Sequence, residues 1–358
     1  MTDCTTLSAN DTVPLTLPEV SLGILPVRLS KRLWVTPSEF LQTTNALVVA
    51  DWAVRVSQTL TRRLPTSARR GPKIVYEGSS ILMMAFIQAA WQMGYEMTVD
   101  YFRAHPGAAL AAGFADGRVV SIGQYWERRR ALGLWPFWFF FLGMVWQLIG
   151  MKIIHGVDVV LDSTTQQAWY HDDPDAAWSF PKPWKNSTWG YKVHTLLCRW
   201  SELPVMFLVT PANRHDGPLA IPLLSLAVAC FDFPIAMVRA DAAYFSYALL
   251  SYIHTVLHAG FVIDYNLRKH GKKALATLSF IRQWRFHLKF RAVIERHFAW
   301  AKRYFGLETA CWKGLTAAYQ HTALVYSVML GVALTAHRYQ RPDLAGSRRK
   351  VLAIHVPA

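Results

Sequence analysis

The sequence predicts an α/β protein, with a mixed sheet flanked by helices that follows an all-helical N-terminal region. The first part of the chain, to about residue 150, carries helix signals, whereas from Val157 short apolar runs alternate with turns. In order, these runs give three strands, a helix, a strand, a helix, a strand and a further helix. A meander followed by alternating strands and helices is typical of a mixed sheet covered by helices.

Helices are expected over most of the N-terminal region, separated by short turns and one basic linker. The expected segments are a helix over residues 38–64 with Ser38 as its N-cap, a linker at 69–73, an apolar helix from about Ile81 to Met93 capped by Ser79 or Ser80, and two shorter helices within 97–130 around a turn at 113–117.

The segment from Ser121 to Arg130 ends in three arginines, Arg128, Arg129 and Arg130. One interpretation is the recognition helix of a helix-turn-helix, whose side chains reach phosphates and bases. The other is a surface helix with a solvated, charged end. The sequence leaves both interpretations open.

An uncharged run from Ala131 to Met151 reaches the roughly twenty residues that a membrane span needs. Gly133, Pro136 and Gln147 interrupt the run, and a lone span would leave the acidic residues further along the chain without a role. We therefore expect a buried helix that packs on the sheet, and no membrane partner.

The second half of the chain gives the strands and helices of the sheet region. The expected strands are residues 157–162, 191–197, 205–210, 235–241 and 261–267, and the expected helices are 219–230, a helix from Ser246 or Tyr247 to near Gly260, the helix around Glu295, and 317–337.

Three acidic residues stand in settings that suggest a metal site. Asp162 and Asp241 each end an apolar run, so each is expected at the end of a buried strand, and Glu295 lies in a basic helical stretch. Carboxylate oxygens suit Mg²⁺, and two such ions can clamp both oxygens of an in-line phosphoryl displacement. The three residues are therefore candidate ligands of two divalent cations.

Cations flank Glu295 at helical spacing. Arg291 precedes it by four residues and Lys302 follows it by seven, which places all three on one helix face. Ordinary charge pairing on a solvated helix would give the same pattern. After two strand-end aspartates in a basic chain, a metal site that contacts a phosphodiester is the favoured interpretation.

These pieces, in this order and spacing, resemble the DDE transposases of bacterial insertion sequences. The resemblance covers roughly residues 65–335. Its parts are Leu161-Asp162-Ser163-Thr164, Trp189-Gly190-Tyr191-Lys192-Val193-His194, Thr210-Pro211-Ala212-Asn213-Arg214-His215-Asp216, Arg239-Ala240-Asp241-Ala242-Ala243-Tyr244 and the helix with Arg291, Glu295 and Lys302. One branch of the family has a tyrosine where this chain has Leu288, so a role of that tyrosine, such as in hairpin intermediates, is not carried over.

The resemblance implies an RNase H-like catalytic core. Together with the composition, it gives the expected division of the chain: a flexible tail at 1–25, a helical DNA-binding or dimerisation region at 26–150, the catalytic domain at 151–337 and a basic tail at 338–358. The implied activity is cleavage at transposon ends followed by joining of the 3′-hydroxyl to target DNA, with two Mg²⁺ (or Mn²⁺) ions. Asp162 would bridge both ions, and Asp241 and Glu295 would each complete one.

Several other polar and aromatic residues have candidate roles at or near the same site. Lys192 and His194 share one face of their strand, which either faces DNA or the site or is a solvated face. Asp158 is expected to make a structural contact, and Asp216 to cap a helix, with Asn213 a weaker site candidate. The acidic cluster Asp172, Asp173 and Asp175 is expected in an exposed connection. Packing is the expected role of Trp184, Trp189 and Tyr244, and stacking on an unpaired base is the alternative.

Composition fits a polyanion partner. Lys and Arg exceed Asp and Glu by fifteen, which favours double-stranded DNA, here the terminal inverted repeats and the target, bound by a homodimer. Four scattered cysteines without CxxC spacing and the lack of a signal peptide favour a reducing, cytoplasmic location near the bacterial nucleoid. The alternatives are a nuclease or resolvase without strand transfer, an inactive DNA-binding derivative and, more distantly, a basic membrane protein.

Overall fold

The computed structural model describes residues 46–61, 76–114, 117–179, 187–263, 292–309 and 312–353. The chain divides into two units, Met1–Val35 and Thr36–Ala358, and all of the described residues lie in the second. The predicted tail at 1–25, the Ser38 cap and the linker at 69–73 therefore lie outside the described residues, and the predicted domain boundaries stay predictions.

The N-terminal region is helical, as predicted, with one helix more than expected. Its helices are α2 (Ala46–Thr61), α3 (Gly78–Trp91), α4 (Tyr95–Ala104), α5 (Pro106–Ala111), α6 (Ile122–Ala131) and α7 (Trp135–Gly150). Pro106 at the start of α5 has no N–H that an unbroken helix could use, so the stretch from 95 to 111 forms two helices.

Helix α3 begins earlier than predicted. Its N-cap is Glu77, so Ser79 and Ser80 lie in the first turn and are buried. The Ser80 hydroxyl donates to the Gly113 carbonyl at 2.9 Å. The prediction that these serines cap the helix is wrong, because the hydroxyl of Ser80 is used to anchor the turn after α5.

Helix α6 has the capping box that its sequence offers. The backbone N–H of Gln124 donates to the Ser121 hydroxyl, and the Gln124 side chain accepts from the backbone of Ser121. This reciprocal pair satisfies donors that a helix start otherwise leaves unpaired. Only Tyr125 of α6 is buried, so most of this helix is available to solvent.

The apolar run at 131–151 forms α7, whose side chains are almost all buried. α7 packs against α2, α13 (Leu315–Arg338) and strand β4 (Pro204–Pro211). Phe141 shows the contact with the sheet: its ring lies 5.0 Å from the ring of Phe207 in β4 and 6.2 Å from that of Tyr326 in α13. The predicted buried helix is therefore observed, although most of its partners are helices.

Among the described residues, α13 is long and apolar enough to cross a membrane, and 83% of its most apolar window is buried inside the protein. Helices α6 and α7 pass the same test only as a pair that is bent by 79°. Burial against protein explains the apolar character of α7 and α13, since both cover the core.

The sheet has six strands within the described residues. They are β1 (Asp158–Gln167), β2 (Ala177–Trp178), β3 (Trp189–Cys198), β4, β5 (Met237–Ala240) and β6 (Gly260–Ile263). β1 lies between antiparallel β3 and parallel β5, β6 follows β5 in parallel, and β2 and β4 both pair with β3. This mixed sheet, with a helical region before it, confirms the predicted fold class.

Strand β1 is longer than predicted and does not end at Asp162. It continues to Gln167 because its pairing with β3 runs unbroken from Val159–Cys198 to Gln167–Gly190. The parallel pairing with β5 stops at Leu161–Ala240. The predicted strand end is therefore correct for the β5 side of β1 and wrong for the β3 side. The β6 strand begins at Gly260, and the rest of its predicted range lies outside the described residues.

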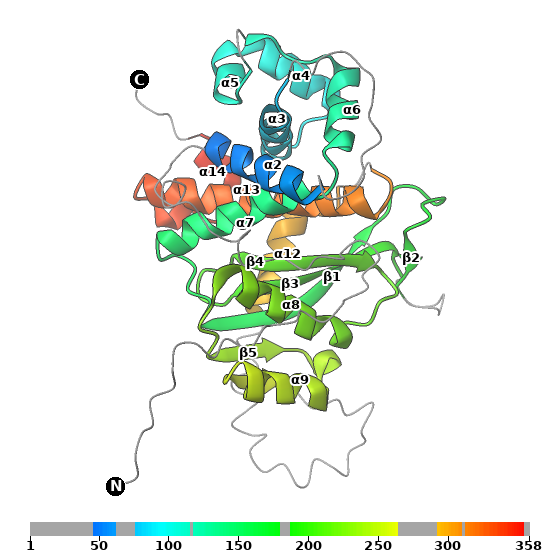
Figure 1. Cartoon of the computed structure of the whole chain (residues 1–358), viewed down its shortest axis with the longest axis vertical. Coiled ribbons are helices and arrows are strands. Elements are labelled where there is room, and N and C mark those ends of the chain that lie inside the picture. The colour runs from blue at the N-terminus through cyan, green and yellow to red at the C-terminus, as the bar shows by residue number, and fades with distance from the viewer. Residues whose placement is uncertain are drawn as a thin grey trace. The chain divides into compact units, whose positions relative to one another are not determined.

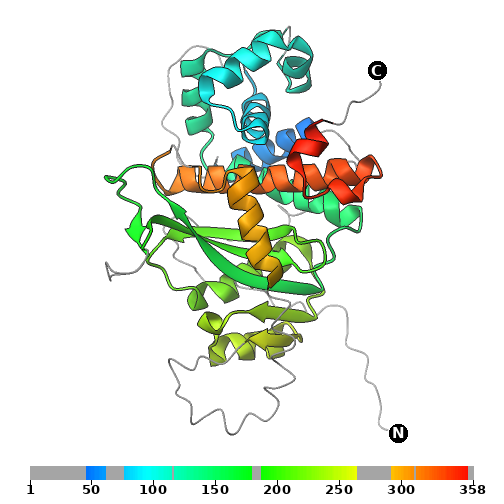
Figure 2. The ribbon, with the colours of Figure 1, turned by 180° about the vertical axis from the view of Figure 1, so that it is seen from behind.

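The remaining helices lie between and after the strands, and several of them cover the sheet. They are α8 (Gly217–Phe231), the 3-10 turn η3 (Ala242–Tyr244), α9 (Tyr247–Ser251) continued by the π-helical turn η4 (Tyr252–Val256), α12 (Ala292–Phe305), α13, η7 (Pro342–Leu344) and α14 (Arg348–Leu352). Figure 1 shows α8 in front of the sheet, and Figure 2, from behind, shows α12 crossing the opposite face.

The segment after β1 is tied to the start of α13. The carboxylate of Asp173 accepts from the Tyr191 hydroxyl at 2.7 Å and from the backbone N–H of Gly314 at 2.9 Å, and Asp175 accepts from the N–H of Leu315. Anionic groups are stabilised at a helix N-terminus. The expectation of an exposed acidic connection is wrong for Asp173, which is buried.

Gly190 allows β1 and the start of β3 to approach closely. Its φ is +153°, and a Cβ atom there would lie 2.2 Å from the carbonyl oxygen of Gln166 and 2.6 Å from the backbone nitrogen of Ala168. No residue with a side chain fits such a distance, which accounts for the glycine in the Trp189-Gly190-Tyr191 segment.

Asp158 makes the structural contact that was predicted for it, and this contact gives a stability test. Its carboxylate accepts from Arg239 Nε at 2.8 Å, Arg239 Nη2 at 2.9 Å and Arg199 Nη1 at 3.0 Å, and Asp158 and Arg239 are both buried. Asp158→Ala should lower the free energy of unfolding by about 3 kcal/mol or more, because it takes the carboxylate from a buried guanidinium.

Urea denaturation of the wild type and of Asp158→Ala measures the difference in the free energy of unfolding. Asp100→Ala is the control, since its ion pair with Arg103 is exposed on both sides and should change stability little. Equal stability of Asp158→Ala and the wild type would contradict a structural role for this ion pair.

Candidate active site

Asp162 and Asp241 lie next to each other at one end of the sheet. Leu161 pairs with Ala240 in the parallel register, and each aspartate is the residue that follows. Adjacent strands are about 4.8 Å apart, so the two backbones are neighbours at this point. Asp241 keeps an extended backbone (φ −71°, ψ 162°) before η3 begins. Both side chains are half-buried.

Both aspartates belong to the face of the sheet that α12 covers. Side chains alternate along a strand, so Asp162 shares its face with Val160. Val160 is in the same buried cluster as Val293, Ile294 and Phe298 of α12. Continuing the parallel register by one residue places Asp241 on this face too, two residues after Arg239, which reaches Asp158 there.

Glu295 follows Ile294 in the first turn of α12, and it is exposed. The helix that carries it therefore packs across the face that holds the two aspartates. Within the described parts of the chain, no three His, Cys, Asp or Glu side chains lie close enough together to hold a metal ion. The register thus brings the backbones of Asp162 and Asp241 together, and the place of Glu295 in the same metal site stays a prediction.

The donor set nevertheless fits a hard divalent cation. Two half-buried carboxylates stand on neighbouring strands, and a third carboxylate stands on the helix that packs on the same face. Oxygen ligands of this kind suit Mg²⁺ or Mn²⁺.

Of the two predicted cations near Glu295, the structure describes Lys302 only. Lys302 is about a quarter exposed and forms an ion pair with Glu308 at 2.5 Å. Arg291 lies outside the described residues. Arg296 directly follows Glu295 on the helix and forms an ion pair with Glu202 in the turn between β3 and β4. Arg296 and Lys302 therefore pair with different carboxylates.

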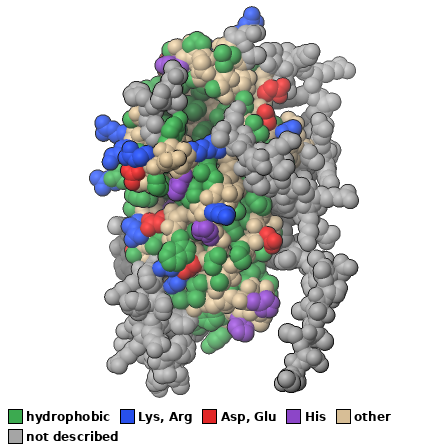
Figure 3. Space-filling view, turned by 90° about the vertical axis from the view of Figure 1, so that its left-hand side faces the viewer, with side chains coloured by type: hydrophobic (Ala, Val, Ile, Leu, Met, Phe, Trp, Pro, Cys, Tyr) green, Lys and Arg blue, Asp and Glu red, His purple; other side chains and the backbone are tan. Residues whose placement is uncertain are grey.

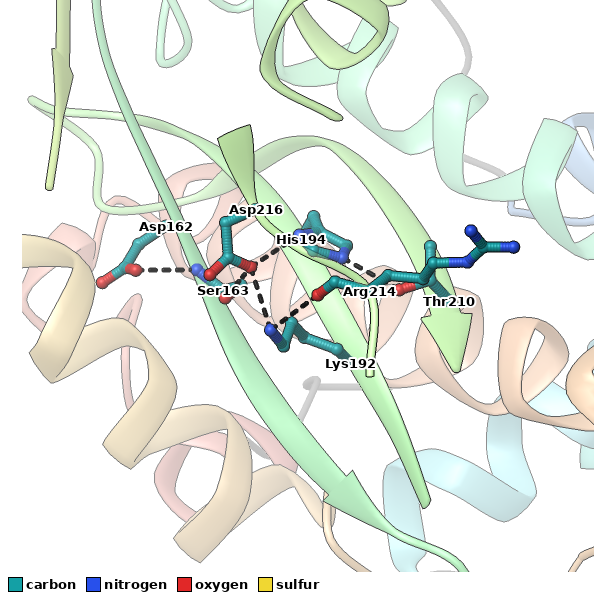
Figure 4. Close-up of polar contacts among 7 residues, drawn as sticks. All are labelled: Asp162, Ser163, Lys192, His194, Thr210, Arg214 and Asp216. Atoms are coloured by element: carbon teal, nitrogen blue, oxygen red, sulfur yellow. Dashed lines mark hydrogen bonds and ion pairs between the residues drawn. The ribbon is translucent and has the colours of Figure 1, made fainter. Parts of the chain in front are cut away.

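On the other face of β1, Asp216 is the centre of a polar cluster (Figure 4). Its Oδ1 accepts from the Ser163 hydroxyl at 2.7 Å and lies 3.3 Å from both Lys192 Nζ and His194 Nδ1. The predicted role of Asp216 as a helix cap is wrong: its side chain makes no capping hydrogen bond to α8, because it turns into this cluster.

The cluster holds Asp216 as a carboxylate. Burial alone would raise its pKa, but His194 and Lys192 beside it and the hydrogen bond from Ser163 lower the pKa to about 2. His194 is almost fully buried, and burial lowers its pKa although Asp216 opposes that change. At neutral pH an ionised Asp216 therefore faces a neutral His194.

Lys192 and His194 face this cluster, which argues against the solvated-face interpretation, while a contact with DNA stays a prediction. His194 Nε2 lies 3.0 Å from Thr210 Oγ1, and Lys192 Nζ donates to the Arg214 carbonyl at 2.9 Å. Neither side chain lies on a simple solvated face. Because side chains alternate along β1 and β3, they lie on the face opposite to that of Asp162, which shares its face with Val160 and the α12 contact.

The aromatic residues weighed for base stacking are placed differently from one another. Tyr244 is buried, and burial together with the carboxylates of Asp216, Asp162 and Asp241 raises its pKa. It therefore cannot stack on a base from solvent, but its surroundings show that these carboxylates are close to it. Trp189 is half-buried and donates to the Tyr170 carbonyl, and Trp184 lies outside the described residues.

The three arginines at the end of α6 have unequal roles. Arg129 donates to Gln88 Oε1 at 2.5 Å and stacks over Tyr95. Arg128 lies over Tyr76 and Arg130 over Trp126, and of the three Arg130 is the exposed one. Arg129 thus supports the helical region itself, while Arg130 remains the best candidate for a contact with DNA.

Sequence reasoning missed the part that Ser163 plays. Its hydroxyl bonds Asp216 and its backbone N–H bonds Asp162. The signal that could have found it is the alternation of β1, which places Ser163 on the face of Lys192 and His194 once the strand is extended beyond Asp162.

Comparison with known families gives one match. Residues 156–330 match the family model described as "Transposase DDE domain". No curated protein and no solved structure matches the chain. The matched range includes Asp162, Asp241 and Glu295, the whole sheet and α12. This match supports a DDE transposase, with the DDE domain at residues 156–330.

Proposed function

We propose that the chain is a DNA transposase that cuts at the ends of a transposon and joins the freed 3′-hydroxyl to target DNA. The observation that carries the proposal is the pair of neighbouring aspartates, Asp162 and Asp241, on the face that α12 and Glu295 cover. These residues stand in the domain that matches the transposase family.

Asp162, Asp241 and Glu295 would hold two divalent ions, Mg²⁺ or Mn²⁺. Asp162 would serve both ions, and Asp241 and Glu295 would each complete one; in support, α12 packs on β1, the strand that carries Asp162. When bound, the ions would supply an activated hydroxyl and stabilise the leaving oxygen. The protein supplies the fixed backbone positions of the two aspartates, which the sheet register sets.

The substrate is double-stranded DNA, including the terminal inverted repeats and the target. A net charge of +15 supports a polyanionic partner. On the face drawn in Figure 3, Lys and Arg side chains gather along one margin. We further propose a homodimer in the DNA complex and a cytoplasmic location near the nucleoid, where this substrate is found.

The first test of this function is removal of each carboxylate. Asp162→Asn, Asp241→Asn and Glu295→Gln should each lower the rate of DNA-end cleavage roughly a hundredfold or more, because each loses charge stabilisation in the transition state. DNA binding should stay close to that of the wild type, since it rests on many phosphate contacts.

The assay is gel analysis of labelled transposon ends in Mg²⁺, read separately for cleaved and joined products. Asp172→Asn, an exposed carboxylate paired with Lys313, is the matched control. Any of the three variants that cleaves like the wild type would be removed from the ligand set. Cleavage without joined products in the wild type would favour the nuclease alternative.

The second test concerns DNA affinity and α6. The logarithm of the DNA association constant should fall steeply with the logarithm of salt concentration, because neutralised phosphates release counterions. Arg130→Ala should weaken end binding and reduce the salt slope by about one, whereas Arg129→Ala should also lower the thermal stability through the loss of its bond to Gln88.

Fluorescence anisotropy at several salt concentrations measures this effect. Arg103→Ala, on α4 and paired with Asp100, is a control that removes one cation from the same region. A loss with Arg103→Ala as large as that with Arg130→Ala would show that only total charge matters, and α6 would leave the recognition proposal.

The third test concerns the cations near Glu295. Lys302→Ala and Arg291→Ala should reduce cleavage at saturating protein more than they reduce end binding, because misplacement of the scissile strand near the reacting groups costs rate. Arg303→Ala is the neighbouring control on α12, about 100° further round the helix, and Arg296→Ala is a second. Equal losses at all four positions would indicate a generic basic helix.

A further inference from the structure

The polar cluster around Asp216 has no part in the proposed chemistry, although it lies directly behind it. Asp216, Lys192 and His194 are on the α8 side of β1, and the aspartate proposed as a shared ligand, Asp162, is on the α12 side (Figure 4). About a fifth of the Asp216 side chain is exposed, and its carboxylate is held between two basic side chains. What connects it to Asp162 is a single residue.

Ser163 contacts both carboxylates. Its hydroxyl donates to Asp216 Oδ1 at 2.7 Å, and its backbone N–H donates to Asp162 Oδ1 at 2.8 Å. Because side chains alternate along β1, the hydroxyl of Ser163 and the carboxylate of Asp162 leave the strand on opposite faces. The two bonds therefore link Asp216 to Asp162 through the thickness of the sheet.

The end of β5 explains why the Ser163 N–H is available to Asp162. Hydrogen-bonded pairs alternate in an antiparallel ladder, and the N–H of Ala168 bonds to Trp189 of β3. Counting back along the unbroken register, the N–H of Ser163 points away from β3, toward β5. The pairing with β5 stops at Ala240, and the N–H of Ser163 donates to the Asp162 carboxylate instead of to a backbone carbonyl of β5.

The other bonds of the cluster fix Asp216 itself. Lys192 Nζ bridges its carboxylate and the carbonyl of Arg214, two residues before Asp216. His194 lies against it on the second side and is braced by Thr210 of β4. Asp216 is thereby held from β3, β4 and the loop that leads to α8, and it offers Ser163 a rigid acceptor.

We propose that Asp216 and Ser163 are positioning residues for the metal-binding carboxylate of Asp162. Asp216 fixes the hydroxyl of Ser163, and this fixes the Ser163 peptide whose N–H holds one oxygen of Asp162. The other oxygen of Asp162 then keeps a set direction toward Asp241. This inference rests on the proposed function, since it assigns the cluster to the same metal site.

The expected effect is a loss of metal affinity and of rate without a loss of DNA binding. Removing a group that orients a metal ligand commonly lowers metal affinity about 10- to 100-fold. Ser163→Ala, which deletes the hydroxyl, and Asp216→Asn, which deletes the charge, should both show this loss. Ser163→Thr keeps a hydroxyl in a strand that accepts β-branched residues, so it should restore metal binding toward the wild-type value.

The experiment measures Mn²⁺ binding to the full-length protein from the electron paramagnetic resonance signal of free Mn²⁺. Asp162→Asn gives the level of binding without the site. Thr165→Val is the matched control: it lies two residues further on the same face of β1, and its hydroxyl contacts Thr188, not Asp216. Cleavage rate at saturating DNA, end affinity and melting temperature are measured for the same proteins.

Lower Mn²⁺ affinity and slower cleavage in Ser163→Ala and Asp216→Asn, with wild-type end affinity and with both properties kept in Ser163→Thr and Thr165→Val, would support the inference. Should Asp216→Asn not fold, Ser163→Ala decides. Wild-type Mn²⁺ affinity in Ser163→Ala, or an equal loss in Thr165→Val, would overturn it. A wild type that neither cleaves DNA nor binds Mn²⁺ above the Asp162→Asn level would overturn the proposed function as well.

Discussion

The position of β1 between an antiparallel and a parallel neighbour is the constraint on which the site depends. β3 pairs with β1 along nearly its whole length, while β5 pairs only as far as Leu161. Within the described residues, the pairing with β5 therefore ends six residues before the pairing with β3 does. Asp162 and Asp241 meet where the parallel pairing ends, and the register that brings them together also fixes which face they share.

The two faces of the sheet carry different groups of side chains. The α12 face combines an apolar contact, Val160 with Ile294 and Phe298, with the carboxylates at the strand ends. The α8 face buries a polar cluster in which Asp216 is ionised because Lys192 and His194 are beside it. A strand one residue out of register would exchange these faces, so both groups depend on the same backbone pairing.

Much of the fold followed from local patterns. The apolar runs, the turn residues and the Ser121–Gln124 capping box predicted the strands and several helices, because these signals act over a few residues. Boundaries were less accurate: β1 extends beyond its apolar run since a paired neighbour can hold polar residues in a strand. The start of α3 was missed because Ser80 bonds Gly113, which is distant in sequence.

The sequence by itself determined the fold class, the two strand aspartates and the basic helix with Glu295, since each is a pattern of neighbouring residues. Only the tertiary structure decided what Asp216, Ser163, Asp173 and Tyr244 do. Asp216 has the sequence signature of a helix cap, but its carboxylate gains more from Lys192, His194 and Ser163, which arrive from two other strands. Such contacts depend on strand order and register, and no window along the chain contains that information.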